Sequence, residues 1–170
     1  PPAVAVLTVE RRISLPALLR NWAIVYAGNL VGAVALAAGF ALSSLLAGPM
    51  GATAVKIAEA KAGLPPRGAL GRGVLCNALV CLAVWLTFAA RDVAGKIFAI
   101  LWPISAFVLL GLEHSVANMY LLPQGMLAGS AVTLQAAVLN LLWVTLGNIL
   151  GGAGGVALAY RFAYLGPAAR

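Results

Sequence analysis

The feature that most constrains this chain is the length of its apolar runs. Four of them lie at about residues 22–46, 73–89, 97–122 and 136–160. A helix rises 1.5 Å per residue, so a run of roughly 20 residues crosses the ~30 Å hydrocarbon core of a bilayer. Only 9% of the 170 residues are charged, whereas soluble domains carry about 25% charged residues. The sequence therefore predicts an all-α, polytopic membrane protein that packs against the lipid bilayer.

The basic residues lie in clusters between the runs. If the runs cross the membrane alternately, seven of the 11 Lys and Arg fall on one side and four on the other. Those four are Lys56, Lys61, Arg67 and Arg72. Loops on the cytoplasmic side carry an excess of Lys and Arg. We therefore expect a multi-pass protein of the cell (inner) membrane with both chain ends in the cytoplasm, and no nucleic-acid partner despite the net charge of +7.

Residues typical of catalysis or metal binding are sparse. The chain has a single histidine, and its two cysteines, Cys76 and Cys81, lie inside one apolar run. This set cannot build a closed structural metal site of the usual composition. The sequence also has no Ser/His/Asp set and no Gly-rich phosphate loop. We therefore expect no enzymatic activity, no catalytic residue, no metal and no cofactor.

The first and fourth runs share a spaced motif. Asn21, Val25, Gly28, Asn29 and Gly32 recur at identical spacing as Asn140, Val144, Gly147, Asn148 and Gly151. Because the matching spans are three apart, they cross in opposite directions, as in the inverted-topology repeats of channels and transporters. With three spans per repeat, residues 1–170 would be a single, N-terminally incomplete transmembrane domain. Each copy also holds a GxxxG pair, which lets helix axes approach closely.

Ionisable and amide side chains are concentrated in the third run. Glu113, His114 and Asn118 lie within six residues of one another, and such groups at membrane depth usually face a cavity or a partner. His114 and Asn118 are four apart and would share a helix face, whereas Glu113 is expected to hold helices together. A helix break is expected near Gly111, and it would aim a helix N-terminus at the cavity.

Two further amides and one aromatic ring complete the candidate site. Asn77 and Asn148 are neutral polar groups inside the second and fourth runs. Phe107 precedes His114 by seven residues, two helical turns along roughly the same face. Its ring would either narrow a passage or pack in the core.

Four segments, taken in order, resemble the formate/nitrite transporter family: Asn21–Leu30, Leu75–Trp85, Gly111–Met119 and Asn140–Gly151. The resemblance implies an aquaporin-like inverted-repeat bundle of six spans, of which this chain would hold the last four. It also implies a homopentamer and transport of a small monovalent anion such as formate, nitrite or hydrosulfide. By position, His114 resembles the central pore histidine, and Lys61 resembles a basic residue on the periplasmic approach. Asn77, Val80, Phe107 and Asn148 match the cytoplasmic constriction and slit.

The leading hypothesis is a channel or transporter for weak-acid anions. An exposed Lys61 would attract the anion, and His114, with a reference pKa near 6.5, would protonate it or stabilise its charge. One alternative is an aquaporin-type channel for neutral solutes, with Asn29 and Asn148 as selectors. The other is a membrane subunit that transports nothing.

Overall fold

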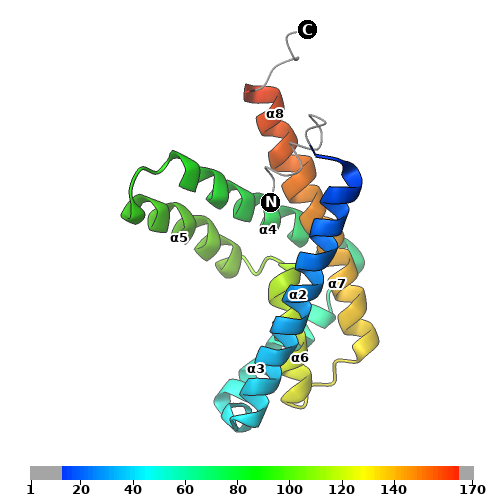
Figure 1. The fold of residues 1–170 in the computed structure, drawn as a ribbon. Helices are drawn as coiled ribbons and strands as arrows, with labels where there is room; N and C mark the ends of the chain where they lie inside the picture. Colours follow the sequence, from blue (N-terminus) through cyan, green and yellow to red (C-terminus); the bar gives the residue numbers. More distant parts are fainter. Residues whose placement is uncertain (1–12, 165–170) are drawn as a thin grey trace.

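The computed structural model describes residues 13–164, and every regular element in that range is a helix (Figure 1). In chain order the elements are α2 (Leu15–Leu42), the short 3₁₀ turn η1 (Leu45–Ala47), α3 (Pro49–Ala62), α4 (Pro66–Ala89), α5 (Val93–Leu109), α6 (Ser115–Leu127), α7 (Leu134–Ile149), the π-helical segment η2 (Leu150–Ala157) and α8 (Leu158–Tyr164).

Short polar residues and prolines mark where the helices begin. Ser14, Asp92 and Thr133 cap α2, α5 and α7 by accepting a backbone N–H three residues on, at 3.4, 2.6 and 3.1 Å. A side-chain oxygen at this position satisfies one of the N–H groups that a first turn leaves unpaired. Pro66 begins α4, where its missing N–H costs nothing.

Three stretches are long and apolar enough to cross a membrane: Leu15–Leu42, Pro66–Ala89 and Leu134–Ala163. They correspond to the first, second and fourth apolar runs. The first helix ends four residues before the expected boundary at 46, and α3, which comes after η1, is not among the predicted elements. The number of membrane crossings stays a prediction.

The third apolar run does not form one helix. Where a span over 97–122 is expected, α5 ends at Leu109 and α6 begins at Ser115. The break lies where the sequence analysis expects one, near Gly111. Pro103 and Pro123 both lie inside the flanking helices, so neither proline causes the interruption.

The helices pack in two parts (Figure 1). In one, α2 and α3 pack on α6, while α7 packs on α4. In the other, α4 and α5 form a helical hairpin that projects from the bundle. A small core of Ala58, Leu122 and Ala137 lies between α3, α6 and α7. Large apolar side chains cover the outer faces, including Val31, Trp102 and Phe162, as expected of a surface that contacts lipid.

Candidate functional site

The break between α5 and α6 is closed by backbone hydrogen bonds around a glycine. Gly111 adopts a φ of +61°, a left-handed conformation that suits glycine because it has no Cβ. The Leu112 N–H donates to the Phe107 carbonyl at 3.0 Å, and the Gly111 N–H donates to the Val108 carbonyl at 3.1 Å. This pair of bonds is the Schellman motif that ends many helices. Gly111 therefore ends α5 at this point.

Asn148 of α7 holds the far side of the break. Its side-chain amide donates to the backbone carbonyls of Gly73 and Glu113, each at 2.9 Å. Its side-chain oxygen accepts the Ser115 N–H, also at 2.9 Å. Ser115 opens α6, so Asn148 satisfies one of the N–H groups that a helix start leaves unpaired. One buried amide thus ties α4, the break and α6 together.

Four side chains close a ring of hydrogen bonds beside the break, and we call this the polar ring: Lys61, Glu113, Asn118 and Asn140. Lys61 Nζ donates to Glu113 Oε1 at 2.9 Å, and Asn118 Nδ2 donates to Glu113 Oε2 at 2.6 Å. Asn118 Nδ2 also donates to Asn140 Oδ1 at 2.8 Å, and Asn140 Nδ2 donates to the Lys61 carbonyl at 2.8 Å. The polar ring joins α3, α6 and α7, and Glu113 contacts Lys61 of α3 and Asn118 of α6 within it.

Lys61 differs from its expected role. Its side chain is only 15% exposed and is paired with Glu113, which is 2% exposed. Lys61 lies in the last turn of α3, the helix that the sequence analysis missed, and α3 packs on α6. It is therefore not an exposed charge that attracts anions through bulk solvent.

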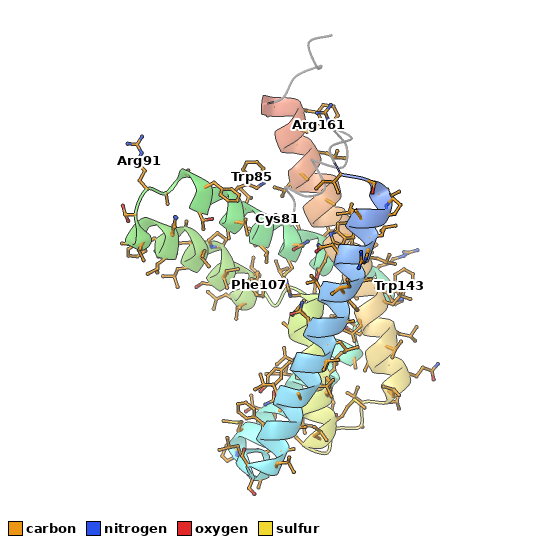
Figure 2. All side chains as sticks on the ribbon, in the orientation of Figure 1. Cys81, Trp85, Arg91, Phe107, Trp143 and Arg161 are labelled. Atoms are coloured by element: carbon orange, nitrogen blue, oxygen red, sulfur yellow. The ribbon has the colours of Figure 1, made fainter. Side chains whose placement is uncertain are left out.

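His114 lies at the start of α6 as its N-cap. Its backbone is extended, with φ −115° and ψ 120°, and its Nδ1 accepts the Ala117 N–H at 3.4 Å. A neutral imidazole that accepts at Nδ1 carries its proton at Nε2. The ring centroid of Phe107 lies 6.2 Å from that of His114, at an interplanar angle of 32°. Figure 2 shows Phe107 at the end of α5 nearest the break, with Arg91 at the far tip of the hairpin.

Asn118 does not share the surroundings of His114. It is fully buried in the polar ring, whereas His114 is half-buried and faces Phe107. The expected shared face assumes a helix through both residues, but His114 precedes the first helical residue. Helical spacing therefore does not relate the directions of the two side chains.

A cavity of about 640 Å³ adjoins this site. It lies between α2, α4, α7 and η2, and Ser115 and Val116 of α6 complete its wall. The first residues of α6 thus face the cavity, as the expected break would require. Its lining includes Asn29, Asn77, Val80 and Asn148, but not Lys61, Phe107, His114 or Asn118. The predicted site residues therefore fall into a cavity group and a group around the break.

Some residues of the site were not singled out from the sequence. Asn140 closes the polar ring, and its recurrence in the internal repeat could have indicated a buried role. The Tyr26 hydroxyl lies 2.9 Å from Thr145 Oγ1 and joins α2 to α7 beside the cavity. No sequence pattern links those two positions. Within residues 13–164, no three His, Cys, Asp or Glu side chains gather as a metal site would require.

Comparison with known proteins gives a consistent picture. A family model described as formate/nitrite transporter matches residues 3–162. A probable formate transporter of Methanothermobacter thermautotrophicus is 43% identical over 92% of this chain and 63% of its own length. The formate channel FocA of Escherichia coli (strain K12) is 34% identical over 95% of this chain and 65% of its own length. The chain thus spans less than two thirds of these curated relatives.

Solved structures agree with the sequence comparisons. A structure described as an FNT family ion channel superposes with a TM-score of 0.85 at 34% identity, over 92% of this chain and 64% of that one. A pentameric formate channel with formate bound superposes with a TM-score of 0.82 at 33% identity, over 90% of this chain and 69% of that one. The fold described above is therefore the fold of these channels.

Proposed function

Because this chain belongs to the formate/nitrite transporter family, we propose that it forms part of a transmembrane path for small monovalent weak-acid anions such as formate, nitrite or hydrosulfide. Relatives are named as formate channels and transporters, which favours formate as the first substrate to test. A structural neighbour is a pentameric formate channel, so the assembled form would be a homopentamer. The distribution of Lys and Arg supports an orientation with both ends of this chain cytoplasmic, and we propose the inner membrane as the location.

The observation that carries the proposal is the helix break with His114 as the N-cap of α6. A bare anion meets a high desolvation barrier in an apolar passage. At the break it would meet an imidazole that can donate from Nε2, together with the positive end of a helix dipole. Once protonated, a weak acid is neutral and passes the Phe107 ring at far lower cost.

The ion pair between Lys61 and Glu113 contributes by cancelling charge near the break. A buried carboxylate at Glu113 without a partner would repel an anion, and a buried ammonium without a partner would trap one. Paired at 2.9 Å, they leave His114 as the titratable group that decides the charge of the bound species. Asn77, Val80 and Asn148 line the adjoining cavity, the path toward the cytoplasmic side in the proposed orientation.

The hydrogen bonds of Asn148 weigh against a neutral-solute channel. Both of its donors and its acceptor are used on backbone groups, so the amide has little left to offer a passing polyol. Asn29, the other selector in that hypothesis, lines the same cavity from α2.

Uptake by a chimera would test the proposal. This chain replaces the matched stretch of the Methanothermobacter relative, and the chimera is reconstituted in proteoliposomes. We expect formate uptake well above that of empty liposomes, and glycerol uptake at the background level. Equal uptake of glycerol would support the neutral-solute channel instead. A reconstituted chimera that carries neither solute would leave the chain as a membrane subunit that does not transport.

A further inference from the structure

Arg72 of α4 places a cation beside the break that no carboxylate neutralises within residues 13–164. Its Nη1 donates to the Gly111 carbonyl at 3.4 Å, and no ion pair reaches it in the described range. That range holds three carboxylates, and each has another polar partner: Glu59 accepts the Ala131 N–H, Asp92 accepts the Gly95 N–H, and Glu113 pairs with Lys61. The positive charge of Arg72 is therefore left without a counter-ion.

Arg72 lies level with the break and faces away from the cavity. The carbonyl of the next residue, Gly73, and that of Glu113 both accept hydrogen bonds from the Asn148 side chain. Arg72 is exposed, but it is not among the described residues that line the cavity, whereas Asn77 of the same helix is. Five helical residues turn a side chain by about 140°, so the two lie on different sides of α4. Because α4 is long and apolar enough to span a membrane, an unpaired charge there is costly in lipid and needs a polar partner.

The guanidinium of Arg72 has donors left for such a partner. It carries five N–H donors in a planar fork, and the bond to the Gly111 carbonyl comes from Nη1 alone. Two parallel N–H groups of the fork match the two oxygens of a carboxylate. Formate is a carboxylate, and nitrite also carries two oxygens on one atom, whereas the single sulfur of hydrosulfide cannot span the fork. The free donors therefore suit a two-oxygen anion.

We propose that Arg72 binds a two-oxygen anion beside the break and so favours formate and nitrite over hydrosulfide, an inference that rests on the proposed transport function. The Gly111 carbonyl holds the guanidinium in place, and the three residues from Gly111 to His114 span at most about 11 Å. The anion is thus bound close to the imidazole that would protonate it. Arg72 takes the role of attracting the anion that the sequence analysis gave to Lys61, whose ammonium is paired with Glu113.

The concentration dependence of formate uptake by the chimera tests the binding role. Arg72→Gln removes the charge and the fork but keeps an amide that can donate to the Gly111 carbonyl. It should raise the KM for formate about tenfold and leave the maximal rate nearly unchanged, as expected when a charge-assisted contact to the bound anion is lost. Arg67→Gln removes an exposed arginine five residues earlier on α4 and is the matched control, which should keep the wild-type KM. An unchanged KM in Arg72→Gln, or an equal rise in Arg67→Gln, would overturn the proposal.

Lysine at the same position tests the selectivity. Arg72→Lys keeps the positive charge and replaces the fork by a single ammonium, so the KM for formate should rise about threefold while the KM for hydrosulfide stays the same. Both anions are measured in the same preparation of proteoliposomes. A rise by the same factor for the two anions would mean that the fork does not select between them, which contradicts the specificity part of the proposal.

Chemical protection measures the anion site without transport. Phenylglyoxal modifies accessible guanidinium groups, and peptide mass spectrometry of the detergent-purified chimera gives the modification rate of each arginine. Saturating formate or nitrite should slow the modification of Arg72 at least about threefold relative to chloride at equal ionic strength, and Arg67 should react at the same rate in all three. Protection of Arg72 in a chimera that takes up no formate would support the anion site and contradict the transport function. If formate gives no protection, or if phenylglyoxal reaches Arg67 but not Arg72, no anion binds at Arg72.

Discussion

At the scale of single residues, the site depends on polar groups that satisfy one another at depth. His114 stands apart from them, because its Nδ1 takes a backbone N–H while Lys61, Glu113, Asn118 and Asn140 bond among themselves. Each side chain of the polar ring is hydrogen-bonded to another member of the ring, although Asn118 Oδ1 has no hydrogen-bond partner within the described residues. We therefore expect the polar ring to be structural and His114 to be the residue that acts on the anion.

Replacing His114 by phenylalanine in the chimera should therefore stop formate uptake at every pH from about 5 to about 8, the range in which histidine titrates. An aromatic ring is kept, so the proposed homopentamer should still form, as measured by size-exclusion chromatography. Leu109→Phe, a ring added at an exposed site two residues from Phe107, is the control and should transport normally. Uptake that is unchanged in His114→Phe would make the residue a cap and nothing more.

Breaking the ion pair between Lys61 and Glu113 should lower the free energy of unfolding. Lys61→Met leaves the Glu113 carboxylate buried without its cation, and loss of one partner from such a pair costs about 3–5 kcal/mol. The double variant Lys61→Met/Glu113→Gln removes both charges and should recover most of that loss. Thermal unfolding in detergent measures both. A melting temperature for the single variant equal to that of the wild type would contradict the burial of this pair.

The salt dependence of uptake distinguishes a buried Lys61–Glu113 pair from an exposed Lys61 that attracts anions. Exposed charges are screened beyond about 8 Å at physiological ionic strength, whereas a buried pair is screened much less. Uptake by Lys61→Ala in the chimera should therefore fall by the same factor at low and at high salt. A defect that disappears at high salt would restore Lys61 as an exposed steering charge.

At the scale of elements, glycine and asparagine decide how close the helices come and where they change register. The π-helical segment η2 begins beside Asn148, whose carbonyl accepts a hydrogen bond from Asn77 Nδ2 at 2.5 Å. In a continuous α-helix that carbonyl would accept the N–H of residue 152. A side chain from α4 thus competes for the carbonyl where the wider turn begins, and π-helical turns are frequent at functional sites.

Asn77→Leu should release this carbonyl and favour an α-helical path through η2. A change of one residue in register turns α8 by about 100° relative to α7. Paired spin labels at Val31 and Ala159 would report the turn as a changed distance distribution. Thr87→Val is the control on the same helix, since the Thr87 hydroxyl bonds only to the Val84 carbonyl of its own helix. A distribution that stays the same in Asn77→Leu would contradict this role of Asn77.

Two glycines three residues apart should respond in opposite ways to alanine. Gly151→Ala drives a Cβ into the Val74 carbonyl and should cost about 1–3 kcal/mol, the usual penalty of overpacking. Gly154 has open space around it, and alanine there should be neutral or stabilise the helix by up to about 1 kcal/mol. The melting temperatures of the two variants give the comparison. Equal shifts would mean that backbone contact with α4 is not what selects glycine at 151.

At the scale of the whole molecule, the two copies of the internal repeat differ in packing. The C-terminal copy packs against α4, whereas the N-terminal copy on α2 is largely exposed. The cavity wall formed by α2 includes Asn21, Val25 and Asn29, while Gly147 and Gly151 of the C-terminal repeat copy are in backbone contact with α4. A passage needs walls on all sides to exclude lipid, and within residues 13–164 α2 packs mainly on α6 and η1, with a hydrogen bond from Tyr26 to Thr145 of α7. We therefore expect transport only from a larger assembly.

This chain reconstituted alone should give no formate uptake above empty liposomes, whereas the chimera should transport. The physical reason is the uncovered α2 face, along which lipid would fill the cavity. Both proteins are measured at equal protein-to-lipid ratio with a formate gradient. Specific uptake by the chain alone would show that it closes a path without further helices.

Sequence alone predicted the membrane class, the fold family and the break, because each depends on local signals such as apolar length, the order of motifs and Gly111. It did not predict α3, which is too short and polar to stand out as a span. It also misplaced Lys61 as exposed, because its partner lies 52 residues away. The sequence placed Asn118 on the same helix face as His114 because helical spacing was applied through His114, which is the N-cap of α6 and not a helical residue. Contacts between distant elements account for these differences.

The polar ring also implies an order in which the helices assemble during synthesis. Ribosomes add roughly 5–20 residues per second, and Lys61 leaves the ribosome 52 residues ahead of Glu113 and 79 ahead of Asn140. For several seconds its ammonium lacks Glu113, the carboxylate that pairs with it in the fold, and an unpaired charge inside lipid is costly. We therefore expect newly made α3 to stay at the membrane–water boundary and to enter the bundle only after α7 has been synthesised. In a chain stalled before residue 140, Asn140 is absent and the polar ring cannot close.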